Sequence, residues 1–168
     1  LAHDRLAFSE EQYDLLIMAK TASLLSGACE TGAIRAPAEQ RQAMREFGLR
    51  LGMAFQIVDD LLDYTGDATI TGKPVGADLR EHKVTLPLIY ALPRLSARQR
   101  REVSALMDTE TPTDAQIAAV VEAVTETGGL DYARERAASL STGAEAALEV
   151  LAPSPAREAL RASIPFVL

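Results

Sequence analysis

The sequence of 168 residues has a single cysteine, no tryptophan and few other aromatic residues. With Cys29 alone, an internal disulfide framework and a zinc site built from cysteines are both excluded. No apolar run approaches the roughly 20 residues that span a bilayer, and no signal-peptide pattern opens the chain, so we expect a cytoplasmic protein without a transmembrane segment. The excess of 24 acidic over 17 basic residues gives a net charge of −7. This argues against nucleic-acid binding, which requires clustered Lys and Arg.

What the chain does contain is typical of helices. Hydrophobic residues make up 48% of it, and Ala, Leu, Glu, Arg and Gln dominate with apolar positions recurring every three or four residues. Capping boxes at Ser9 with Gln12 and at Thr113 with Gln116 mark two helix starts, and Ser96 caps a third. The sequence therefore predicts an all-α domain with a polar loop over about 65–81. The expected helices cover about 9–30, 37–65, 85–92, 97–108, 114–127, 130–151 and 156–164.

Three aspartates crowd one turn near the end of the second predicted helix. Asp59 lies four residues before Asp63, and Asp60 lies three residues before it, so like charges repel along the turn. The helix macrodipole also disfavours negative charge at this end, and the intervening residues are apolar. Because local rules broken together mark functional sites, we expect one here. Carboxylates without neighbouring His or Cys favour Mg²⁺, or Mn²⁺ in its place, over zinc. A solvated acidic helix end is the alternative.

Two lysines that could hold a phosphate group follow the acidic turn. Lys73 lies in a glycine-containing loop, and Lys83 comes ten residues later. The loop does not match a Walker A motif, because five residues separate Gly66 from Gly72 and Pro74 replaces the Ser or Thr. The alternative interpretation is that both lysines are solvated surface residues. The neighbouring carboxylates favour the phosphate-binding interpretation over this one.

Two polar side chains occupy apolar helix faces. Lys20 falls between Leu16 and Leu24 in the apolar stripe of the first helix, where it either snorkels to the edge or faces an internal anion. Gln56 lies one turn before Asp60, and a buried amide needs hydrogen-bond partners. The stripe as predicted consists of Tyr13, Leu16, Ile17, Leu24 and Ala28. Lys20 and Gln56, together with the three aspartates, Lys73 and Lys83, describe a metal–diphosphate site walled by helices.

Several segments around the aspartates and lysines resemble, in their order and spacing, the second aspartate-rich region of the trans-type polyprenyl diphosphate synthases. The resemblance lies in segments 55–64, 66–67, 72–79 and 83–87, and in Lys20-Thr21-Ala22 on the preceding helix. It spans about 13–92 and implies a helical bundle of the isoprenoid synthase type around a deep apolar cavity. It also implies a homodimer that joins isopentenyl diphosphate to an allylic diphosphate, head to tail, with Mg²⁺.

The resemblance also assigns roles to individual residues. Asp59 and Asp63 would bind Mg²⁺, with Asp60 assisting either directly or by supporting the other two, and Asp78 would have a supporting role. The side chains that hold the allylic diphosphate or line its reacting end would be Lys20, Thr21, Gln56, Lys73 and Lys83.

One departure from the family pattern bears on the function. The family carries two aspartate-rich motifs, and Asp59-Asp60 is the only Asp-Asp pair of this chain. The first motif would lie upstream of Leu1, so we expect residues 1–168 to be the C-terminal part of a single synthase domain, without its N-terminal helices. The predicted function is a Mg²⁺-dependent prenyltransferase. The alternatives are a non-catalytic binding or regulatory subunit of a heteromeric synthase and, matching the Lys73–Lys83 loop less closely, a terpene cyclase.

Overall fold

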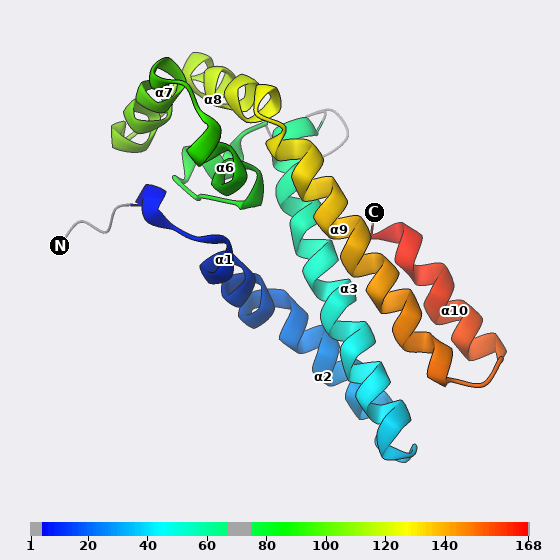
Figure 1. Cartoon of the computed structure of the whole chain (residues 1–168). Helices are drawn as coiled ribbons and strands as arrows, with labels where there is room; N and C mark the ends of the chain where they lie inside the picture. Colours follow the sequence, from blue (N-terminus) through cyan, green and yellow to red (C-terminus); the bar gives the residue numbers. More distant parts are fainter. Residues whose placement is uncertain (1–4, 67–74, 168) are drawn as a thin grey trace. The chain divides into compact units, whose positions relative to one another are not determined.

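The computed structural model describes residues 5–66 and 75–167 (Figure 1). Every regular element within these ranges is a helix, which confirms the predicted all-α fold. None of these helices is both long and apolar enough to cross a membrane. The longer helices are α1 (Glu10–Ile17), α2 (Ser23–Gly32), α3 (Ala38–Thr65), α7 (Ala97–Asp108), α8 (Asp114–Glu126), α9 (Gly129–Ala147) and α10 (Pro155–Ser163). The short ones are η1 (Arg5–Ala7), η2 (Met18–Ala22), α5 (Ala77–Arg80), α6 (Leu86–Ala91), η3 (Leu92–Arg94), η4 (Leu148–Val150) and η5 (Ile164–Phe166).

The helix starts follow the capping residues that the sequence predicts. Thr113 accepts the N–H of Gln116 at 3.3 Å, and the Gln116 side chain accepts the N–H of Thr113 at 2.9 Å. Ser96 makes the same reciprocal pair with Gln99 at the start of α7. These bonds satisfy N–H groups that a helix start otherwise leaves unpaired. The predicted boundaries of α7 and α8 therefore agree with the structure to within a residue.

A single wide turn interrupts the first predicted helix. The π-helical segment η2 carries one extra residue between α1 and α2. The buried positions consequently run Tyr13, Ile17, Ala22 and Ser26, in steps of four, five and four. The predicted stripe is therefore partly wrong. Its members Leu24 and Ala28 follow the π-helical turn and are exposed, because the prediction assumed uninterrupted α-helical spacing. Leu16 precedes that turn and is exposed because the buried face of α1 runs through Tyr13 and Ile17.

The chain packs as two compact units. Unit 1 comprises Leu1–Tyr13 and Asp59–Arg134, and unit 2 comprises Asp14–Val58 and Glu135–Leu168. In unit 1, α7 and α8 lie side by side and α6 packs against α8 (Figure 1). Side chains that are almost fully buried in unit 1 include Leu79, Leu86, Leu88, Val103, Leu106, Val120 and Val124.

The core of unit 2 is built from one face of α3 and from the chain's C-terminal helices. Its central side chains are Met44, Phe47, Leu51, Ala144, Leu148 and Ile164. Arg161 on α10 forms an ion pair with Glu145 on α9 at 2.7 Å, so these two helices lie beside each other. Unit 2 thus supports the part of α3 that precedes the acidic turn.

Candidate functional site

The acidic turn at the end of α3 lies in unit 1, and its three carboxylates differ in their surroundings. Asp59 is exposed, Asp60 is buried and Asp63 is half-buried. Consecutive helical residues point about 100° apart, whereas residues four apart share a face. Asp59 and Asp63 therefore share a face, and Asp60 lies beside it. The three carboxylates stay within one turn, as predicted, but they differ in how deeply they are buried.

Asp60 is hydrogen-bonded to a residue that the sequence analysis did not assign to the site. The Tyr13 hydroxyl donates to Asp60 Oδ2 at 2.7 Å, across 47 residues of sequence. Both side chains are buried, with Tyr13 1% and Asp60 6% exposed. The sequence signal that could have identified Tyr13 was its position on the predicted apolar face of the first helix, because a buried tyrosine hydroxyl normally requires a hydrogen-bond partner.

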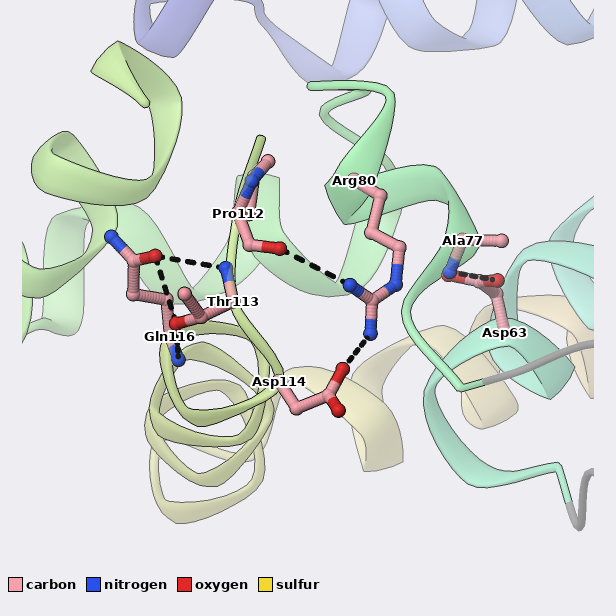
Figure 2. Close-up of polar contacts among 7 residues, drawn as sticks. All are labelled: Asp63, Ala77, Arg80, Pro112, Thr113, Asp114 and Gln116. Carbon is pink, nitrogen blue, oxygen red and sulfur yellow. Dashed lines mark hydrogen bonds and ion pairs between the residues drawn. The ribbon is translucent and has the colours of Figure 1, made fainter. Parts of the chain in front are cut away.

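Asp63 fastens the end of α3 to the start of α5. Its Oδ1 accepts the N–H of Ala77 at 2.9 Å, and its Oδ2 accepts the N–H of Asp78 at 3.0 Å. Its backbone carbonyl accepts the N–H of Gly76 at 2.8 Å. Burial raises the pKa of the Asp63 carboxyl and the charge of Asp78 adds to this, while the two backbone N–H groups and Lys83 oppose it. Figure 2 shows the bond from Ala77.

The other end of α5 is held by Arg80. Its guanidinium donates to the carbonyl of Pro112 at 3.1 Å and pairs with Asp114 in the first turn of α8 (Figure 2). The same turn of α8 begins at the capping box of Thr113 with Gln116. The frame around Asp63 is therefore built from three helices of unit 1.

Lys83 is joined to this frame through ion pairs. Its ammonium lies 2.9 Å from Asp78 Oδ1 and 2.7 Å from Glu81 Oε2. The hydrogen bonds that Lys83 donates to Glu81 and Asp78 raise the pKa of its ammonium group, so the side chain is a cation at neutral pH. An anion that binds Lys83 would exchange with these carboxylates. The second predicted lysine of this region, Lys73, lies outside the described residues.

The charges of three carboxylates act on the buried Tyr64 in unit 1. Burial raises the pKa of the Tyr64 hydroxyl, and the charges of Asp63, Asp60 and Asp78 raise it further. Among the residues that the structure describes, no group of three or more His, Cys, Asp or Glu side chains is arranged to hold a metal ion. Mg²⁺ commonly binds through one or two carboxylates and keeps several waters. The exposed Asp59 and the half-buried Asp63, whose oxygens have further lone pairs, fit that limited requirement.

The remaining predicted site residues lie in unit 2. The Thr21 hydroxyl donates to Gln56 Oε1 at 2.8 Å, and Gln56 is 4% exposed. The bond is possible because the helices approach closely: a Cβ at Gly52 would lie 2.6 Å from the Cα of Ala22. Lys20, in the same π-helical turn as Thr21, is exposed. Such turns occur frequently at functional sites.

The comparisons with known proteins agree on one family. The family model described as Polyprenyl synthetase matches residues 2–124. The short chain isoprenyl diphosphate synthase of Methanothermobacter thermautotrophicus is 36% identical over 167 residues, covering 98% of this chain and 51% of that protein. The octaprenyl diphosphate synthase of Escherichia coli is 38% identical over 154 residues, covering 90% of this chain and 47% of that protein.

The solved structures give the same result. The crystal structure of a polyprenyl synthase from Caulobacter crescentus, complexed with calcium and isoprenyl diphosphate, matches with a TM-score of 0.89 and 36% identity. The match covers 96% of this chain and 50% of that one. This chain thus spans about half the length of the relatives it matches.

Proposed function

The chain belongs to the polyprenyl synthetase family, and we infer that the protein it comes from is a Mg²⁺-dependent prenyltransferase. Its relatives are named isoprenyl and octaprenyl diphosphate synthases. The proposed reaction joins isopentenyl diphosphate to an allylic diphosphate, head to tail. This chain would supply the second aspartate-rich motif and several of the groups that bind diphosphate.

One observation carries the proposal: Asp78 connects a cationic side chain to the acidic turn within unit 1. Its backbone N–H donates to Asp63, and its carboxylate accepts from Lys83. Carboxylates suited to a hard cation and an ammonium suited to a phosphate oxygen therefore share the frame of α5. A metal-bound diphosphate needs both. The Caulobacter crescentus relative, with its calcium and isoprenyl diphosphate, is consistent with that pairing.

The chain's own residues would act mainly by holding charged groups at fixed positions around the diphosphate. Asp59 and Asp63 would hold Mg²⁺, which supplies Lewis-acid stabilisation of the diphosphate leaving group. Lys20, Lys73 and Lys83 would bind diphosphate oxygens as the allylic C–O bond breaks. Thr21 fixes the orientation of the Gln56 amide, which we place near the reacting end of the substrate. Donors held in place in this way stabilise the charge that develops in the transition state.

The direct test uses the full-length protein. Incubation with Mg²⁺, isopentenyl diphosphate and farnesyl diphosphate, followed by mass spectrometry, is expected to give products lengthened by whole isoprenyl units. The same incubation in EDTA should give none. Equal product in EDTA would contradict the metal requirement. No product, together with Mg²⁺-dependent binding of diphosphate, would favour the second candidate, a non-catalytic subunit of a heteromeric synthase.

We also propose a homodimer in the cytoplasm. Unit 2 exposes large apolar side chains, including Leu24 at 74% and Ile34 at 61%, which association with further helices would cover. Sedimentation velocity of the full-length protein and cell fractionation test these two proposals. A monomer would contradict the first, and recovery with membranes would contradict the second.

A further inference from the structure

The bond between Tyr13 and Asp60 is not used in the mechanism above, although Asp60 belongs to the acidic turn. Burying a carboxylate to 6% exposure is costly unless hydrogen bonds compensate it. The Tyr13 hydroxyl supplies such a bond, and its 2.7 Å length is normal for a hydroxyl that donates to an oxygen. The pair therefore keeps the second aspartate of the motif inside unit 1.

The donor is itself held firmly, because the first turn of α1 is anchored in two ways. Ser9 and Gln12 form a capping box, with bonds of 2.9 and 3.3 Å. The Tyr132 hydroxyl lies 2.8 and 2.9 Å from the two carboxylate oxygens of Glu10. Tyr13 thus extends from a helix start that unit 1 fixes in place.

Tyr132 is in turn supported by a stack of side chains. Its ring stacks on Tyr90 with centroids 4.2 Å apart, and the Arg94 guanidinium lies 3.5 Å from the centre of the Tyr90 ring. Aromatic and cation–π contacts of this kind add to the burial of the rings. The position of the Tyr13 hydroxyl is therefore set before any ligand binds.

We propose that Tyr13 is a positioning residue for the acidic turn. Its hydroxyl holds the Asp60 carboxylate inward, so that Asp59 and Asp63 present the exposed oxygens while Asp60 contributes a fixed negative charge behind them. The inference rests on the proposed function, because the ligand attracted by this charge is the cation of a metal–diphosphate complex. Groups that orient metal ligands from behind typically change metal affinity about 10- to 100-fold when they are removed.

The test measures the binding of inorganic diphosphate with Mg²⁺ to the full-length protein by calorimetry. Tyr13→Phe, which removes only the hydroxyl, is expected to weaken binding about tenfold. Asp60→Asn is expected to weaken it as well, although its amide oxygen can still accept from Tyr13. Adding Tyr13→Phe to Asp60→Asn should then change the affinity little, because the charge that Tyr13 positions is already gone.

Ser26→Ala is the control, because it removes a buried hydroxyl that donates to the carbonyl of Arg45 at 2.9 Å within unit 2 and has no role in the site. It should lower the melting temperature and leave the affinity unchanged. A Tyr13→Phe protein that is folded and binds like the wild type would overturn the inference alone. A wild type that does not bind diphosphate with Mg²⁺ would overturn the proposed function, and this inference with it. If Tyr13→Phe does not fold, Asp60→Asn decides, and an unchanged affinity in that variant overturns the inference.

Discussion

Replacing Asp59 with Asn is expected to remove most of the Mg²⁺-dependent affinity for diphosphate and to leave the free energy of unfolding unchanged. Asp59 is exposed at the acidic turn, so its carboxylate contributes charge rather than packing. Removing a group that only supports a metal ligand typically lowers metal affinity about 10- to 100-fold, and removing a ligand should lower it at least as much. Calorimetry with inorganic diphosphate, with and without Mg²⁺, measures the affinity, and urea denaturation measures the stability.

Asp63→Asn should differ from Asp59→Asn in a diagnostic way. The Asp63 carboxylate accepts from both Ala77 and Asp78, and an amide has only one oxygen to offer them. The variant should therefore lose affinity and also about 1–3 kcal/mol of stability, the cost of leaving a half-buried donor unpaired. An Asp63→Asn protein as stable as the wild type would contradict the role of Asp63 in fastening α5.

The control for both variants is an exposed aspartate elsewhere in unit 1. Asp131→Asn, whose side chain is 78% exposed beside Arg134 in the first turn of α9, should leave the affinity unchanged and cost less than about 1 kcal/mol of stability. If Asp59→Asn, or the double variant Asp59→Ala/Asp63→Ala, kept full Mg²⁺-dependent affinity, the metal assignment would be wrong.

Local signals made the helices and their starts predictable. The spacing of apolar residues and the capping boxes act within a few residues of each other, and the helix starts at Ser96 and Thr113 follow them. The π-helical turn was not predictable in this way. The extra residue in η2 allows Ala22 to face Gly52, which lies 30 positions further along the chain. A prediction that assumes regular helical spacing therefore assigns Leu24 and Ala28 to the buried face, whereas both are exposed.

The residue types of the acidic site were predictable, but the different environments of its three carboxylates were not. The spacing of the aspartates indicated repulsion, and the structure gives each carboxylate a different environment. The partners of Asp60 and Asp63 come from residues 47 and 14–15 positions away, across turns that the sequence does not specify. Lys83 reaches Asp78 and Glu81 because the chain turns at His82, whose φ is +57°. Long-range contacts of this kind depend on the assembled fold.

Gly76→Ala tests whether that fold, rather than the aspartates alone, maintains the site. Gly76 has a φ of +79° and donates its N–H to the Asp63 carbonyl. A Cβ added there would lie 2.3 Å from Cγ2 of Ile117, which is 4% exposed. The left-handed conformation and the overpacking together are expected to cost about 3 kcal/mol of unfolding free energy in urea denaturation. Diphosphate affinity should fall as well, since α5 would no longer hold Asp63 in place.

Gly128→Ala separates the two causes. Gly128 has nearly the same φ, +78°, but no atom would lie within 4 Å of an added Cβ. This variant should therefore show only the conformational cost of about 1–2 kcal/mol, with diphosphate affinity unchanged. In an Ile117→Ala background, Gly76→Ala should become less costly, because the methyl group it meets is gone. If the two glycine variants lost the same free energy of unfolding, Ile117 would move aside without cost. The packing of α5 against α8 would then not be what holds Asp63 in place.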